Sequence, residues 1–381
     1  MKRFLLVIFL LLGSITGCSE IDGIKTIALT KCLNAEKNKN YNEAFKWCSK
    51  AANQGSAEAQ TELGIMYAEG QGVTQDYNKS LELFALAAEQ GIADAQFSLG
   101  LMYKNGQGVS QDYKQAVKWY TLAAEQGEVK AQVNLGTMYK KGQGVTKDYK
   151  EALKWYTLAS EQGEVKGQVN LGIMYKKGQG VTQDYKQAVK WYTLAAEQGE
   201  VNAQVYLGNM YKDGEGVTKD YKEALKWYTL ASEQGDAHAK FALGSMYFSG
   251  EGITQDYNQA VNWFTLAAEQ GYANAQFILG LIYKGGFGAT QDYKRTVKWH
   301  TLAAEQGDAS AQHSLSTMYY SGLGTLKDIV YAHMWSNIAS SNGIDNAPAY
   351  RDNLESSMTK EQIAEAQKLA RECVAKDYKG C

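Results

Sequence analysis

The chain has 381 residues, of which 45% are hydrophobic and 21% charged, and its formal net charge is −2 at pH 7. Lys and Arg never run beyond pairs, so the chain lacks the clustered cations of a phosphate-binding surface, and we expect no nucleic-acid partner. The single proline, Pro348, favours long uninterrupted helices over a loop-rich or polyproline structure.

The N-terminus is expected to be a targeting segment. Two basic residues precede the apolar run Phe4–Leu12, which is too short to span a bilayer. The following stretch, Ile15–Cys18 (ITGC), resembles a bacterial lipobox. That resemblance implies a signal peptide over residues 1–17, acylation of Cys18 and, because Ser19 rather than Asp follows, sorting to the outer membrane. The alternative is an ordinary secretory signal that a cysteine follows by coincidence.

The rest of the chain repeats with a period of 36 residues. From Ser56 onward the glycine of a "QG" or "NG" pair recurs at this spacing without an insertion. We therefore expect a lipidated tether over residues 18–22, an N-terminal capping unit over 23–55, eight repeats over 56–343, and C-terminal capping helices with a tail over 344–381. The tryptophans occupy one position of the repeat: Trp47, Trp119, Trp155, Trp191, Trp227, Trp263, Trp299 and Trp335.

Each repeat is predicted to form two helices. Apolar residues in Ala57–Glu69 follow helical spacing, and Gly70 offers the left-handed conformation that ends a helix. Asp76 stands at the N-cap position of a second helix, which Gly91 ends. A single hairpin buries too little apolar surface to stand alone, so the repeats must stack. The fold class is therefore all-α, an α-solenoid with a C-terminal capping helix.

These residues carry a family resemblance. The stretch Ala131–Gly163 (AQVNLGTMYKKGQGVTKDYKEALKWYTLASEQG) resembles the Sel1-like repeat, a relative of the tetratricopeptide repeat. The resemblance extends from about Asp22 to Lys376, and the last full repeat departs from it at Ser316 and Ile329. It implies a protein that organises complexes through the concave face of the solenoid, and some bacterial members engage host proteins such as secretory immunoglobulin A.

The cysteines are confined to the ends of the chain. Apart from Cys18, they are Cys32 and Cys48 in the first unit and Cys373 and Cys381 in the tail. In an oxidising compartment, adjacency favours the pairs Cys32–Cys48 and Cys373–Cys381, which would staple the ends where a neighbouring repeat is missing. Free buried thiols are the alternative for both pairs. A capping box at Thr359–Gln362 is expected to start the last helix.

Two patterns suggest chemistry. His300, His313 and His333 lie in the last two repeats, but no acidic residue or cysteine accompanies them at ligand spacing, so core histidines are preferred to a metal site. Ser357 and Lys360 match Ser-x-x-Lys, the start of one β-lactamase signature, without its companion motifs. We expect no cofactor, no metal and no small-molecule substrate.

The near-identity of the repeats bears on function. Residues 128–163 and 164–199 keep even surface lysines such as Lys140 and Lys176, which builds a periodic face rather than one catalytic constellation. We therefore expect a non-enzymatic scaffold, lipid-anchored at the outer membrane, with protein partners from the envelope or a host. A rigid spacer fits the repetition equally well. The alternative class is a cell-wall or β-lactam hydrolase related to cysteine-rich Sel1-like β-lactamases.

Overall fold

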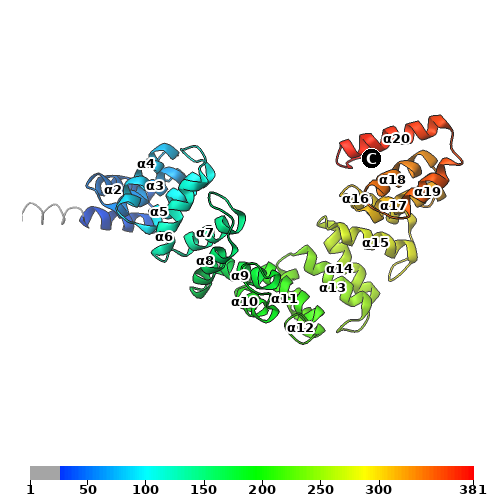
Figure 1. The fold of residues 1–381 in the computed structure, drawn as a ribbon, viewed down its shortest axis with the longest axis horizontal. Coiled ribbons are helices and arrows are strands. Elements are labelled where there is room, and N and C mark those ends of the chain that lie inside the picture. The colour runs from blue at the N-terminus through cyan, green and yellow to red at the C-terminus, as the bar shows by residue number, and fades with distance from the viewer. Residues whose placement is uncertain (1–25) are drawn as a thin grey trace, which may run out of the picture. The chain divides into compact units, whose positions relative to one another are not determined.

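The computed structural model describes residues 26–381, which contain helices and turns and no strand. Cys18, the predicted lipidation site, lies outside the described residues. Compact packing divides the chain into two units, residues 26–191 and 192–381, and the division falls inside α10 (Tyr185–Glu197). Figure 1 shows the helices in chain order. Every helix among residues 26–381 is too short or too polar to cross a bilayer.

Helix pairs of nearly constant length build both units. A helix over residues 26–37 precedes α2 (Tyr41–Asn53). The first helices of the following repeats are α3 (Ala57–Glu69), α5 (Ala93–Asn105), α7 (Val129–Lys141), α9 (Val165–Lys177), α11 (Val201–Asp213), α13 (Ala237–Ser249), α15 (Ala273–Gly285) and α17 (Ala309–Ser321). The second helices are α4 (Tyr77–Glu89), α6 (Tyr113–Glu125), α8 (Tyr149–Glu161), α10, α12 (Tyr221–Glu233), α14 (Tyr257–Glu269), α16 (Tyr293–Ala304) and α18 (Ile329–Ser341).

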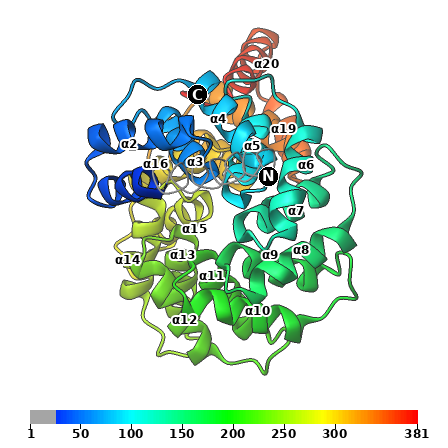
Figure 2. The ribbon, with the colours of Figure 1, turned by 90° about the vertical axis from the view of Figure 1, so that its left-hand side faces the viewer.

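Within each unit, the first helices lie side by side on one side and the second helices on the other (Figure 2). We call the solvent side of the first helices the first-helix face, and that of the second helices the second-helix face. The expected all-α solenoid of stacked helix pairs is confirmed.

The loop inside each repeat is fixed by its glycines and its aspartate. Gly70 adopts φ 72° and donates its N–H to the carbonyl of Met66, so it closes α3 as predicted. Asp76 then accepts hydrogen bonds from the backbone N–H groups of Asn78 and Lys79 at 3.0 and 3.1 Å. Gly72, also left-handed, lies against the carbonyl of Tyr41, where any Cβ would collide. The loop is thus a helix–helix connector that also contacts the preceding repeat.

A second glycine lets the two helices of a repeat approach closely. The Cα of Gly136 faces the ring of Tyr156, and a Cβ added there would lie 2.9 Å from Cε1 of that ring. In the last full repeat, Ser316 replaces this glycine and Ser336 replaces the tyrosine that faces it. Ser316 then donates to the carbonyl of Ala332 at 2.6 Å, and Ser336 donates to the carbonyl of Ala347 at 3.0 Å. The missing ring makes room for the hydroxyl, so the departure at Ser316 is accommodated.

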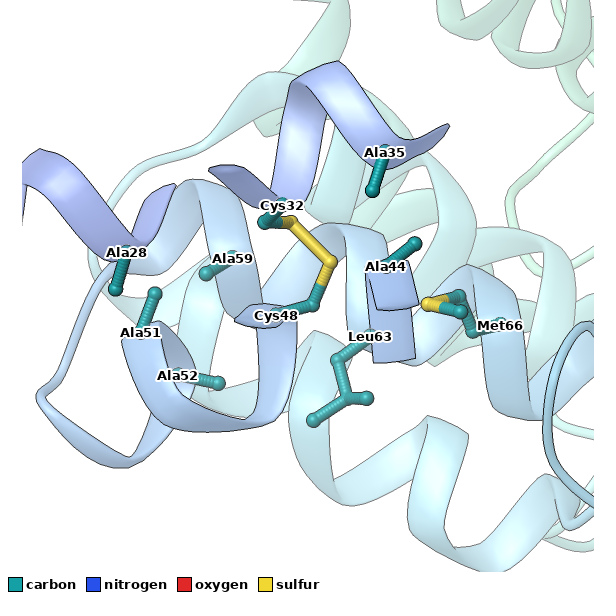
Figure 3. Close-up of a cluster of buried hydrophobic side chains, with 10 residues drawn as sticks. All are labelled: Ala28, Cys32, Ala35, Ala44, Cys48, Ala51, Ala52, Ala59, Leu63 and Met66. Carbon is teal, nitrogen blue, oxygen red and sulfur yellow. A yellow bond between two sulfur atoms is a disulfide. The ribbon is translucent and has the colours of Figure 1, made fainter. Parts of the chain in front are cut away.

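The ends of the chain are closed by disulfides and by helices. Cys32 joins Cys48 with the Cα atoms 4.8 Å apart, and the bridge is buried against Ala51, Ala59 and Leu63 (Figure 3). This pairing ties the helix over residues 26–37 to α2. A second disulfide joins Cys373 to Cys381, with the Cα atoms 5.5 Å apart.

At the C-terminus, α19 (Ala347–Glu355) leads to α20 (Lys360–Ala375), which packs on α18. Thr359 accepts from the N–H of Gln362, and the Gln362 side chain accepts in return from the N–H of Thr359, so the predicted capping box is present. Ala370 and Cys373 pack in one cluster with Trp335. The last helix thus covers the apolar side of α18 that another repeat would otherwise bury.

Candidate functional site

The first-helix face of residues 26–191 carries a repeated polar contact. Nζ of Lys104 on α5 donates to Oδ1 of Asn134 on α7 at 3.0 Å, and Lys140 on α7 makes the same bond to Asn170 on α9 at 3.0 Å. Each bond joins two successive repeats, so we call it a rung. Partial burial lowers the pKa of Lys104 and of Lys140, and neighbouring lysines lower both further.

Carboxylates gather at the N-terminal end of this face. Glu62 on α3 shares a hydrogen bond with Glu36, and burial, with the nearby charges of Glu36 and Asp94, raises the pKa of Glu62 to about 7. Burial also raises the pKa of Glu128, to which Asp94 again contributes. Within this unit, carboxylates therefore lie on the helix over residues 26–37, on α3 and at the starts of α5 and α7, whereas the rung lysines lie near the ends of α5 and α7.

The second-helix face has a different periodic feature, in which a lysine covers each of several tryptophan rings. Nζ of Lys118 lies 5.0 Å from the centroid of Trp119, and Nζ of Lys154 lies 4.8 Å from that of Trp155. The same contact recurs at Lys190–Trp191, Lys226–Trp227 and Lys298–Trp299. Such exposed cation–π contacts contribute about 0.5–1 kcal/mol each, so these lysines cover the faces of the tryptophan rings rather than form a reactive site.

The three C-terminal histidines contact separate partners. The buried ring of His300 stacks on Phe277, with centroids 5.4 Å apart, and burial lowers the pKa of His300 to about 4. His313 meets the edge of Tyr350, and Nε2 of His333 lies 2.8 Å from Oε1 of Glu355. Among residues 26–381, no group of three or more His, Cys, Asp or Glu side chains has a metal-binding arrangement.

Ser357 and Lys360 lie in the turn before α20. The hydroxyl of Ser357 donates to the carbonyl of Leu354 at 3.2 Å, and Lys360 is the first residue of the helix that Thr359 caps. Both side chains are exposed. Their structural role in the turn accounts for the sequence match.

Comparison with known protein families accounts for this architecture. The Sel1 repeat family model matches nine consecutive stretches, 35–56, 57–92, 93–128, 129–164, 165–200, 201–236, 237–272, 273–308 and 309–344. The chain belongs to the Sel1 repeat family. The expected family resemblance is thereby confirmed, and each matched repeat from 57 onward contains one first helix, its glycine loop and one second helix.

Solved structures of Sel1 repeat proteins resemble the chain over most of its length. A Sel1 repeat protein from Oxalobacter formigenes is 34% identical, covers 81% of this chain and 90% of its own, and has a TM-score of 0.70. Protein c5321, a protective antigen of uropathogenic Escherichia coli strains, is 36% identical over 95% of this chain and 85% of its own, with a TM-score of 0.52. No curated protein matches significantly.

Three features of this Sel1 repeat protein were not predicted from its sequence. They are the lysine–asparagine rungs, the close contact between the carboxyl groups of Glu36 and Glu62, and an apolar pocket beside α13. The 36-residue alignment does place each rung lysine and the asparagine of the next repeat 30 residues apart. The contact itself depends on how far successive first helices are offset, which the spacing alone does not fix.

Proposed function

We propose that the protein is a non-catalytic scaffold that binds other proteins through its first-helix face. The rungs Lys104–Asn134 and Lys140–Asn170 carry the proposal, because they present the same pair of side chains at two successive steps along the face. A surface of this kind suits an extended partner that makes many weak, equivalent contacts. The affinities of these contacts combine into a stronger overall binding. A catalytic site instead needs different groups converging on one point.

The proposal includes the subcellular localisation inferred from the N-terminal sequence. Acylation of Cys18 would anchor the chain at the outer membrane, with partners in the envelope or on a host. This localisation is supported by the short apolar run that precedes Cys18 and by Ser19, which follows it. Membrane fractionation and labelling with a fatty-acid analogue test it, because Cys18→Ala is expected to abolish both the label and the membrane association. Labelling of the Cys18→Ala variant would contradict it.

Crosslinking in intact envelopes followed by affinity capture tests the scaffold function. We expect protein partners to be captured by the wild type and lost when the rung residues Lys104, Lys140, Asn134 and Asn170 are replaced by Ala. A matched variant on the second-helix face, Lys118→Ala with Lys154→Ala, should keep the partners. Capture that depends on the second-helix face would place binding on the wrong side, and the absence of any partner would reject the proposal.

A further inference from the structure

The first-helix face of residues 192–381 departs from the earlier repeats around α13, where it opens into an apolar pocket of about 560 Å³. The pocket lies among α11, α13 and α15. Its walls include Phe241, Phe248, Phe264, Ile278 and Leu281. This volume is in the range of sites that hold a compact ligand group, and its lining is apolar with a few polar groups.

The pocket exists because the rung residues have been replaced. At the position of Asn134 and Asn170, the repeats of α11, α13 and α15 carry Tyr206, Ala242 and Ile278, and at the position of Lys104 and Lys140 the repeat of α13 carries Phe248. An alanine opposite Lys212 cannot accept the lysine's hydrogen bond. Phe248 and Ile278 bring apolar groups to a place where the earlier repeats have a lysine and an amide.

The mouth of the pocket is also apolar where other repeats are polar. Phe287 follows α15 at a position held by glutamine in four earlier repeats, and its side chain is 53% exposed. Leu281 is 38% exposed beside it. Apolar groups that stay exposed around a hollow indicate a surface that another molecule covers.

Polar groups at the rim are placed to receive a polypeptide. Asn209 lines the rim and accepts a hydrogen bond from the hydroxyl of Tyr228 at 2.7 Å through Oδ1, which fixes the orientation of its amide. Lys212 supplies a cation on the α11 side, with Nζ 3.7 Å from Oδ1 of Asp213. Glu251 supplies a carboxylate after α13, and its Oε1 accepts a hydrogen bond from the hydroxyl of Tyr221 at 2.9 Å. A peptide with an acidic residue before or after its anchor and a basic residue on the other side matches these two charges.

We propose that this pocket binds one bulky aromatic or branched aliphatic side chain of a partner polypeptide, whose flanking acidic and basic residues pair with Lys212 and Glu251. This inference rests on the proposed scaffold function and gives it a specific anchor point. The rungs supply repeated weak contacts. An apolar side chain of the partner that is buried in the pocket fixes where along the face the partner binds.

The experiment uses a displayed library of random 12-residue peptides selected on the chain lacking residues 1–17. The key variant introduces the rung residues by Ala242→Asn, Phe248→Lys and Ile278→Asn, which are the residues found at these positions in the repeats of α7 and α9. Phe287→Gln is a milder second variant at an exposed position. The matched control is Leu266→Ala, which removes a 45% exposed leucine from α14 on the second-helix face.

We expect the selected peptides to share a bulky apolar residue with opposite charges on its two sides. Their affinity should fall at least tenfold in the rung-restoring variant, by a smaller factor in Phe287→Gln, and not in Leu266→Ala. Methyl NMR signals of Met246, Ile278 and Ile282 should shift on titration of a selected peptide into the wild type.

Other outcomes overturn the proposal. Peptides that bind the rung-restoring variant as well as the wild type would leave the scaffold function standing and reject the pocket as its anchor. Selection of no peptide, together with binding of the free dye 1-anilinonaphthalene-8-sulfonate that the variant loses, would assign the pocket to a small apolar molecule. A dimer in sedimentation that the variant abolishes would assign it to a second copy of the chain.

Discussion

The side-chain amide of Gln126 donates a hydrogen bond to Oε1 of Gln96, thirty residues earlier, at 2.7 Å. Gln96 in turn donates to the carbonyl of Ala88 at the end of α4, at 3.1 Å, and is only 4% exposed. One buried amide therefore links the second helices of two successive repeats. The arrangement recurs at Gln132–Gln162, Gln204–Gln234, Gln276–Gln306 and Gln312–Asn342.

Replacing one of these amides should weaken the contact between repeats. In Gln132→Leu, the carbonyl of Ala124 and the amide of Gln162 lose their shared partner inside the protein. The carbonyl of Ala124 keeps the N–H of Gly127 and the amide of Gln162 keeps the carbonyl of Gly127, so the loss is that of two hydrogen bonds, about 0.5–1.5 kcal/mol each. Urea denaturation should show this loss, and an unchanged midpoint would mean that water replaces the amide at no cost.

The chain contains a natural exception that provides the reverse test. Lys240 stands where Gln204 and Gln276 stand in the neighbouring repeats, and its Nζ reaches only the carbonyl of Gly235, at 3.4 Å. Lys240→Gln should restore the buried amide and stabilise the protein by about 1 kcal/mol. A stabilisation measured by the same urea titration would confirm the role of the amide, whereas a destabilisation would refute it.

Two left-handed glycines form a matched pair for testing the contact between repeats. Gly144 (φ 73°) faces the carbonyl of Tyr113 in the preceding repeat, and a Cβ there would collide with it, whereas Gly163 (φ 87°) has no atom within 4 Å of such a Cβ. Gly163→Ala should cost only the conformational strain, about 1–2 kcal/mol. Gly144→Ala should cost clearly more, because the backbone must move. Equal losses of the free energy of unfolding in chemical denaturation would show that the contact between the loop and the neighbouring repeat does not contribute to stability.

The N-terminal disulfide should stabilise the first helices. Cys32 and Cys48 are 16 residues apart, and closing a loop of that length contributes about 3 kcal/mol in the chain-entropy account. The double variant Cys32→Ala with Cys48→Ala should expose residues 26–53 to proteolysis and hydrogen exchange before the rest of the chain. The matching change at Cys373 and Cys381 should affect α20 instead. Equal protection of residues 26–53 in the wild type and the variant would contradict this role.

Glu62 should make stability depend on pH. Its folded-state pKa of about 7 lies above the ordinary value of 4.5, so between these values the folded chain holds a proton that the unfolded chain has lost. The stabilisation is complete below pH 4.5 and is lost as the pH rises through 7. With allowance for screening at this part-exposed group, we expect about 1–2 kcal/mol.

Comparison with Glu62→Gln isolates this effect, because the amide cannot ionise beside Glu36 and Asp94. Thermal unfolding from pH 4.5 to 8 should show the difference between the two proteins growing with pH, in favour of the variant. The comparison also removes the opposite contribution of His300, whose lowered pKa costs stability as the pH falls from 6.5 to about 4. Parallel pH profiles would show that Glu62 titrates normally.

The sequence predicted the elements that a single repeat encodes. Helical spacing, the glycine at 70 and the aspartate at 76 were enough to place α3 and the start of α4, because caps and periodicity act within a few residues. The family was suggested by the resemblance of the stretch Ala131–Gly163 to the Sel1-like repeat. These signals are local, and they are present in every copy.

Contacts between repeats were harder to predict. Gln96 and Gln126 are ordinary polar residues in the sequence, and their burial becomes visible only when the offset between stacked hairpins is known. The pocket at α13 has a signal in Phe248 and Ala242, which replace a lysine and an asparagine. That signal shows that the surface changes there but does not show that it becomes hollow.

The amide and loop contacts described above have a consequence for how the gene can change. The recurring amide contacts are each made between a repeat and its immediate neighbour, 30 residues apart, and Lys240 marks a repeat in which the buried glutamine is replaced. Deleting or duplicating one 36-residue stretch among the near-identical copies, as unequal recombination does, leaves each remaining joint with its proper partners. The number of repeats can thus change in one genetic event, while the contacts between the remaining repeats are kept.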